Sequence, residues 1–301
     1  MWLYLGIASA LFLGVYDVFK KWSVDDNAVP EVLFLSTCFG ASLMLPVFVL
    51  SRVFPTEMSS VSLYAGFPSA VEHIFIVAKT VLVSISWITA YVALKHLPIS
   101  IVSPIRASAP LWTLMGAVLL FGEQLRPLHW LGIFVTFISY YLFSVLGKRE
   151  GIRFFRNRYI ALVFVATVTG ALSALYDKYL LQAVHIPPVT LQTWFSFYLV
   201  GTTGIIMVLL RRRRLEKSVT FKWRMTVPLI GVFLIVADYL YFRALSETEA
   251  LIAVLSMIRR SSVVISFVTG GILFREQNKR KKAVPLLGVL IGIALLLIGK
   301  H

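Results

Sequence analysis

Charged residues are scarce in this sequence. They make up 14% of its 301 residues, whereas hydrophobic residues make up 58%. A soluble domain of this length needs roughly 25% charged residues to cover its surface. The shortage, together with a mean hydropathy of +0.84, indicates that most of the surface faces lipid. The composition therefore predicts an integral membrane protein.

Cysteine and the motifs of common enzymes are also missing. The single cysteine, Cys38, lies inside a hydrophobic run, which excludes an intramolecular disulfide framework. The sequence has no H-E-x-x-H, no G-x-S-x-G and no Gly-rich phosphate loop, and its five histidines are scattered near the ends of hydrophobic runs. We therefore expect neither an enzyme nor a metal site, no cofactor, and no transport driven by ATP hydrolysis within this chain.

Long hydrophobic runs are abundant. A bilayer core about 30 Å thick is crossed by roughly 20 helical residues, and ten runs come close to that length. These predict an all-α membrane protein with ten transmembrane helices. The runs lie at 2–19, 32–51, 71–95, 98–121, 128–147, 158–180, 188–210, 224–245, 249–274 and 283–299. We interpret the first as a retained helix, because Tyr16, Asp17 and Lys20 stand where the cleavage site of a signal peptide would need small residues.

The basic residues gather in alternate loops. In a soluble protein a net charge of +15 would suggest a nucleic-acid partner, but this distribution indicates membrane topology instead. The crowded loops lie at 20–21, 95, 148–158, 211–224 and 275–282. By the positive-inside rule we expect a multi-pass protein of the cell (inner) membrane with both termini outside. The run at 211–214 has RNA or anionic lipid binding as its alternative interpretation.

Two short motifs recur at the same spacing along the chain. SPIRAS at 103–108 returns as SMIRRS at 256–261, and FGEQ at 121–124 returns as FREQ at 274–277. Weaker echoes join Tyr16-Asp17 to Tyr176-Asp177 and the segment 91–94 to 242–245. The pattern predicts two related five-helix halves, 1–150 and 151–301. Because five is odd, the second half must enter the membrane from the opposite side, as in inverted-repeat transporters with a site at the midplane.

These motifs resemble the EamA-type branch of the drug/metabolite transporter superfamily. The resemblance rests on the pattern from Pro98 through Pro110 to the FGE segment, and on its copy ending at Glu276. It covers nearly the whole chain. It implies ten helices around a central cavity and a cargo among amino acids, other metabolites, nucleotide sugars or phosphorylated sugars. Many bacterial members have cytoplasmic termini, so the charge pattern here departs from theirs, and transport direction cannot be carried over.

Several ionisable residues fall deep inside the predicted helices. Taking about 1.5 Å per residue, they lie roughly 10 to 20 Å from a helix end, where charge is costly and usually serves a cavity or a partner. They are Lys79, Arg106, Asp238, Arg259 and Arg260. Because Arg106 and Arg259 occupy equivalent positions in the two halves, we expect them on either side of the cavity, clamping an anionic group.

Each of these residues also has a structural interpretation. The arginines could cap carbonyl groups or pair with Asp238, which could alternatively relay a proton or contact an amine. Lys79 could snorkel toward a helix end. Asp17 and Asp177 lie near predicted helix ends, where we expect a solvated or dipole-related role, and Glu123 is expected to tie its loop to a nearby Arg or Lys.

Three aromatic residues complete the predicted binding site. Trp87, Tyr91 and Tyr239 lie near the middle or inner face of their helices, where a ring can stack on a cargo or serve only packing. We expect a secondary transporter that carries a small organic metabolite by alternating access, and we expect this metabolite to be an anion bearing phosphate or carboxylate. A flippase for an anionic lipid carrier such as a polyprenyl phosphate, or an exporter of amino acids, remains the alternative. The expected partners of the protein are its cargo and membrane lipids. We expect the protein itself to be a monomer or a homodimer.

Overall fold

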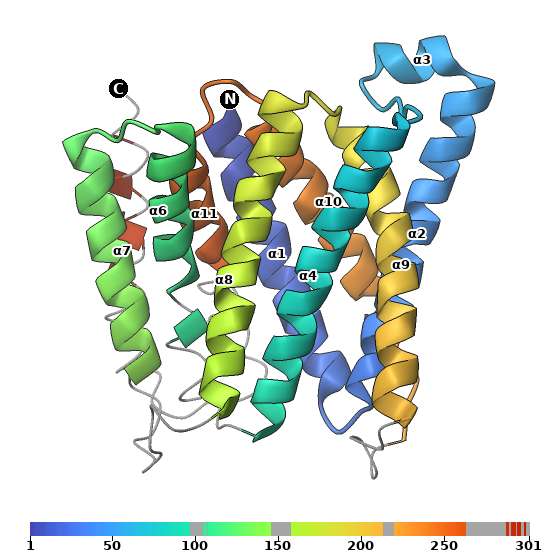
Figure 1. The fold of residues 1–301 in the computed structure, drawn as a ribbon, viewed down its shortest axis with the longest axis horizontal. Coiled ribbons are helices and arrows are strands. Elements are labelled where there is room, and N and C mark those ends of the chain that lie inside the picture. The colour runs from blue at the N-terminus through green and yellow to red at the C-terminus, as the bar shows by residue number, and fades with distance from the viewer. Residues whose placement is uncertain are drawn as a thin grey trace. The chain divides into compact units, whose positions relative to one another are not determined.

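The computed structural model describes most of the chain. The described residues are 1–96, 105–106, 108–145, 158–212, 220–262, 287–288, 290–292, 294–295 and 298. Within these ranges all regular secondary structure is helical (Figure 1). The predicted all-α class is therefore confirmed for the part of the chain that the structure describes.

Long helices account for most of the described residues. They are α1 (Trp2–Val24), α2 (Val29–Val53), α4 (Ala70–His96), α7 (Pro127–Val145), α8 (Arg158–Lys178), α9 (Pro188–Arg212) and α10 (Thr226–Leu245). The shorter elements are α3 (Pro55–Ser60), α6 (Ala109–Phe121), α11 (Ile252–Arg260) and the π-helical turn η2 (Tyr179–Ala183). Among the described residues, 6 helices are long and apolar enough to cross a membrane, and two shorter ones are also apolar.

Seven of the predicted helices are described over most of their length. Their ends shift by a few residues; α1 runs on to Val24 because no Pro or Gly interrupts residues 15–24. The run predicted at 98–121 is described only as α6 and the helical residues 105–106, and the run at 249–274 only as α11. The last run is helical at its few described positions. The total of ten helices stays a prediction.

The chain forms two compact units, and each combines segments from both predicted halves. Unit 1 comprises Met1–Ser84 and Asp177–Thr248, and unit 2 comprises Ile85–Tyr176 and Glu249–His301. The helices α4 and α8 each contribute residues to both units. The division of the sequence into inverted halves stays a prediction.

In unit 1, α10 packs against α1 and α2, and α2 packs against α9 (Figure 1). Tyr16, Val32, Val227 and Ile230 form a buried apolar cluster. The backbones of α2 and α10 touch at Gly231, where an added Cβ would lie 2.5 Å from a carbonyl oxygen of α2. Small residues at such a crossing let helices approach closely, which is typical of helix packing in membranes.

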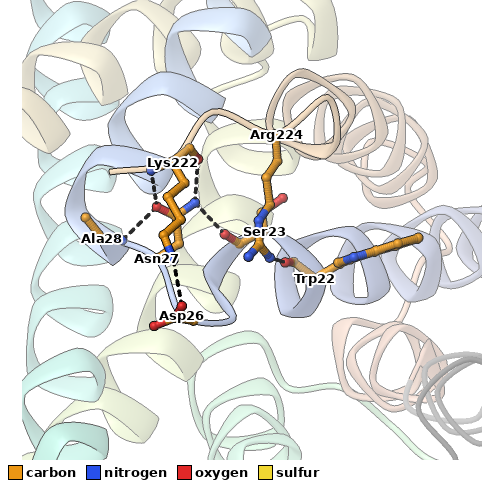
Figure 2. A network of polar contacts seen from close by, with 7 residues as sticks. All are labelled: Trp22, Ser23, Asp26, Asn27, Ala28, Lys222 and Arg224. Atoms are coloured by element: carbon orange, nitrogen blue, oxygen red, sulfur yellow. Dashed lines mark hydrogen bonds and ion pairs between the residues drawn. The ribbon is translucent and has the colours of Figure 1, made fainter. Parts of the chain in front are cut away.

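A polar network ties the turn between α1 and α2 to the segment that precedes α10 (Figure 2). The Asn27 amide nitrogen donates to the carbonyl oxygens of Ser23 (3.0 Å) and Lys222 (2.8 Å). Its amide oxygen accepts from the backbone N–H groups of Ala28 (2.9 Å) and Lys222 (2.8 Å). An asparagine side chain has two donors and two acceptor sites, so this buried amide satisfies its full hydrogen-bonding capacity.

In unit 2, α11 packs against α6 and α7. A buried cluster of Ala93, Ile105, Ile160 and Val163 joins the described segments around it. The Ser86 hydroxyl donates to the carbonyl oxygen of Ala166 at 2.7 Å, which links the later part of α4 to α8. Apolar packing and interhelical hydrogen bonds of this kind are what hold helices together in a bilayer.

Candidate functional site

The most deeply placed charged groups in unit 1 form an ion pair between α4 and the end of α8. The Lys79 ammonium donates to Oδ1 of Asp177. Lys79 is 3% exposed and Asp177 is 5% exposed. Removing each charge from water costs several kcal/mol, and the mutual attraction of the two charges offsets that cost only when the geometry is good.

Two phenyl rings surround the lysine. The Lys79 ammonium lies 4.3 Å from the ring centroid of Phe195 on α9 and 5.0 Å from that of Phe242 on α10. A desolvated cation over an aromatic face gains about 2 kcal/mol from the ring quadrupole. The rings therefore offer the Lys79 ammonium group favourable contacts in place of water.

Asp177 was expected to have a solvated or dipole-related role near a helix end; the dipole-related alternative stays a prediction, whereas the burial of Asp177 shows that the solvated one is wrong. The reason is that α8 continues into η2, so that the candidate span extends over Arg158–Ala183 and keeps Asp177 inside it. The wider turn is visible in the hydrogen bond from the Val184 N–H to the Tyr179 carbonyl oxygen, 3.0 Å. π-helical turns occur frequently at functional sites. The sequence signal available was the echo of Tyr16-Asp17 in Tyr176-Asp177.

Unit 2 brings two of the predicted arginines together. The Arg260 guanidinium donates from Nη2 to the backbone carbonyl oxygen of Arg106 at 2.5 Å, and both side chains are half-buried. Arg259 is also half-buried and stands with Arg260 in the last turn of α11, where positive charge complements the helix dipole. Arg106 and Arg259 take part in further contacts.

Glu123 has a partner that the sequence did not suggest. Its carboxylate accepts the backbone N–H groups of Ile252 (2.7 Å) and Ala253 (3.2 Å), and it is 7% exposed. The first N–H groups of a helix lack partners within the helix, and Leu251 at the N-cap has no side chain that can supply one. Glu123 thus caps the helix that carries Arg259 and Arg260, in addition to any basic partner.

The other predicted site residues divide between the two units. Asp238 and Tyr239 are half-buried on α10 in unit 1, one turn before Phe242 and so on the same side of the helix as that ring. Trp87 is half-buried on α4 in unit 2, and the backbone of Tyr91 continues the same helix, whereas the Tyr91 side chain lies outside the described residues. The predicted pairing of Asp238 with an arginine stays a prediction. Among the residues described, no three His, Cys, Asp or Glu side chains are grouped to hold a metal ion.

Comparison with known proteins agrees with this architecture. The chain matches the EamA-like transporter family over residues 1–145 and 157–298. No curated protein matches it. A solved structure described only as "Crystal structure of protein" is 14% identical, with a TM-score of 0.75, over 98% of this chain and 96% of that one. At that identity the likeness shows a shared fold and nothing about cargo.

Proposed function

Because the chain belongs to the EamA-like transporter family, we propose that it is a secondary transporter that carries a small organic anion by alternating access. Proteins of this family are transporters and not enzymes, and the apolar helices make this one a multi-pass membrane protein. The sequence has no phosphate-binding loop, which leaves exchange, the gradient of the cargo or coupled ions as the source of energy. The basic loops favour a cell-membrane location with both termini outside.

The gathering of arginines in unit 2 is the observation that supports an anionic cargo. Arg260 reaches the backbone of Arg106, and Arg259 is the neighbour of Arg260 on α11. A guanidinium group presents a planar fork of donors that matches carboxylate and phosphate oxygens.

Uptake by reconstituted protein tests this proposal. Proteoliposomes are loaded with unlabelled compound and the uptake of labelled glucose 6-phosphate, gluconate or leucine is measured, with a fluorescent polyprenyl phosphate for lipid flipping. We expect exchange of one of the two anions. Preferred exchange of leucine would favour an amino-acid exporter, and flipping of the lipid would favour a lipid carrier; either result without anion exchange contradicts the proposal.

Arginine variants test the residues that are proposed to bind the anion. Arg106→Ala and Arg259→Ala should each remove a hydrogen bond to a charged group, about 1.5–3 kcal/mol, and so lower anion uptake roughly 10- to 150-fold. Arg126→Ala is the matched control, because that side chain is exposed. Melting temperatures close to wild type establish that the variants fold. Wild-type uptake by both folded variants would refute the arginine site.

A further inference from the structure

Helix packing alone does not require two charged side chains at the position of the buried pair Lys79 and Asp177. Both charges are almost completely removed from solvent inside candidate membrane spans. Replacing a buried ion pair by apolar side chains of similar volume is often neutral or stabilising, so that such a pair is weak evidence for stability. Ionisable residues within membrane spans mark ion pathways and proton relays instead.

The sequence echoes give Asp177 an aspartate counterpart in the first predicted half, but they give Lys79 no lysine counterpart in the second. Asp177 corresponds to Asp17. Segment 91–94 corresponds to segment 242–245, and the same spacing counted from Lys79 leads to Ile230. Ile230 belongs to the apolar cluster with Tyr16, Val32 and Val227. The lysine at this position is therefore specific to one of the two predicted halves.

We propose that Asp177 is the proton-binding site that couples transport to a proton gradient, with Lys79 as its counter-charge. When the pair separates during the transport cycle, a hydronium ion transfers its proton to a carboxylate oxygen of Asp177, which leaves a water molecule and a neutral carboxylic acid. Lys79 stays an ammonium ion, held by the faces of Phe195 and Phe242. The pair then changes from neutral to singly positive, with no other bond formed or broken.

This charge change gives the coupling a direction. A protonated pair carries one positive charge, which compensates the one negative charge of a monoanionic cargo, so that proton and anion cross together without net charge movement. An unpaired carboxylate in a low-dielectric interior becomes neutral because its charged form is too costly there. The inference of symport rests on the proposed anion transport, whereas the assignment of the proton site to Asp177 does not.

Other ionisable groups lie on the helices around the pair. They are Lys178 and Tyr179 after Asp177, His73 on α4, Tyr198 on α9, and Asp238, Tyr239, Tyr241 and Arg243 on α10. His73 lies on the same helix as Lys79, and its Nδ1 is hydrogen-bonded to the Tyr198 hydroxyl at 2.8 Å. A pH effect on transport can therefore be assigned to Asp177 only if it survives His73→Gln.

The transport experiment compares two assays on the same proteoliposomes with gluconate as the probe. Exchange at equal pH needs no coupling, whereas accumulation under an inward proton gradient does. For wild type and His73→Gln, a gradient of about one pH unit should drive close to tenfold accumulation if one proton accompanies each anion. Asp177→Asn should keep the exchange and lose the accumulation. Asp25→Asn, in an exposed turn, is the matched control for the change of carboxylate to amide.

A second variant protects the test against misfolding. Lys79→Met/Asp177→Leu fills the site with apolar side chains and is expected to fold. Its melting temperature should stay close to that of wild type, and it should fail to accumulate gluconate under the gradient. Accumulation as in wild type by either Asp177 variant would overturn the proposal, as would wild-type exchange that is indifferent to the gradient.

An infrared measurement decides the proton site without any cargo. A pH titration of the reconstituted protein should show the C=O band of a buried carboxylic acid in wild type between about pH 5 and pH 9, and the band should be missing from Asp177→Asn. If no probe is transported, the proposed anion transport fails while the infrared result still decides the proton site. A titration with no band that depends on Asp177 would overturn the assignment.

Discussion

The amide of Asn27 offers the most direct test of how the described loops hold the helices of unit 1. Asn27→Ala removes hydrogen bonds to Ser23, Ala28 and both backbone groups of Lys222. Each net hydrogen bond contributes about 1 kcal/mol, and buried groups left without partners cost more than that. Because water can reach part of this turn, we expect a loss of about 2–4 kcal/mol in the free energy of unfolding.

Asn27→Asp distinguishes the hydrogen bonds that the Asn27 side chain donates from those that it accepts. An aspartate keeps both acceptors for the N–H groups of Ala28 and Lys222, but loses both donors and turns an oxygen toward the carbonyl groups of Ser23 and Lys222 (Figure 2). We expect it to retain about half of the stabilisation, roughly 1–2 kcal/mol. Unfolding is followed by helical circular dichroism during titration with sodium dodecyl sulfate in mixed micelles.

The control for both variants is Asp25→Ala, which alters an exposed side chain in the same turn. Surface substitutions of this kind change stability by at most about 0.5 kcal/mol. If Asn27→Ala unfolds at the same detergent fraction as Asp25→Ala, the turn does not depend on the amide. The assumption that a fully satisfied buried amide fastens two distant segments would then be refuted.

Three further predictions concern separate parts of the molecule. The hydrogen bond and charge of Lys222 lower the pKa of Asp26. The contribution of this pair to stability is therefore present above the ordinary pKa of an aspartate and is lost as the pH falls through the lowered pKa. The melting temperatures of wild type and Asp26→Asn should differ slightly at neutral pH and converge in acid. Glu123→Ala removes the acceptor of two N–H groups at the start of α11, a loss of about 1–3 kcal/mol, and hydrogen exchange at the first turn of α11 should accelerate. Equal exchange rates in the variant would contradict that capping role. Gly231→Ala places a Cβ against the backbone of α2 and should cost about 1–3 kcal/mol, whereas Gly201→Ala, with no atom within 4 Å of the added Cβ, should be neutral or stabilising in the same detergent titration.

Hydropathy predicted the helices well because the bilayer imposes one requirement on every span. Each helix needs a long apolar run whatever it packs against, so the ranges at 188–210 and 224–245 could be derived without knowing any neighbour. The short helix α3, Pro55–Ser60, was not predicted, because six residues outside the spans follow local turn chemistry. Helix ends also shifted, since they depend on where loops are tied down by groups such as Asn27.

The candidate site was harder to predict because burial of a charge depends on another element. Lys79 was identified from its depth in a predicted span, but its partner Asp177 was not. The sequence gives no sign of the π-helical turn that follows Asp177 or of the rings of Phe195 and Phe242 beside the lysine. Glu123 was placed at a helix end correctly, yet its contact with the start of α11 joins positions that are far apart in the chain.

The arginines show the same limit in another form. Their repeated motif placed Arg106 and Arg259 at equivalent positions, and the structure adds that Arg260 is the residue that contacts the Arg106 backbone. Equivalence in a repeat is a statement about ancestry, whereas a hydrogen bond depends on the rotation of each helix about its axis. The predicted clamp therefore stays a prediction that the uptake measurements decide.

The glycine crossing of α2 and α10 limits how unit 1 can change shape. At Gly40 and Gly231 the two backbones are so close that an added Cβ on Gly231 would lie 2.7 Å from the Gly40 nitrogen. Sliding either helix by a single residue would bring a bulkier side chain into a space that holds only hydrogen atoms. We therefore expect α2 and α10 to move together during transport. A covalent crosslink between them should leave turnover intact.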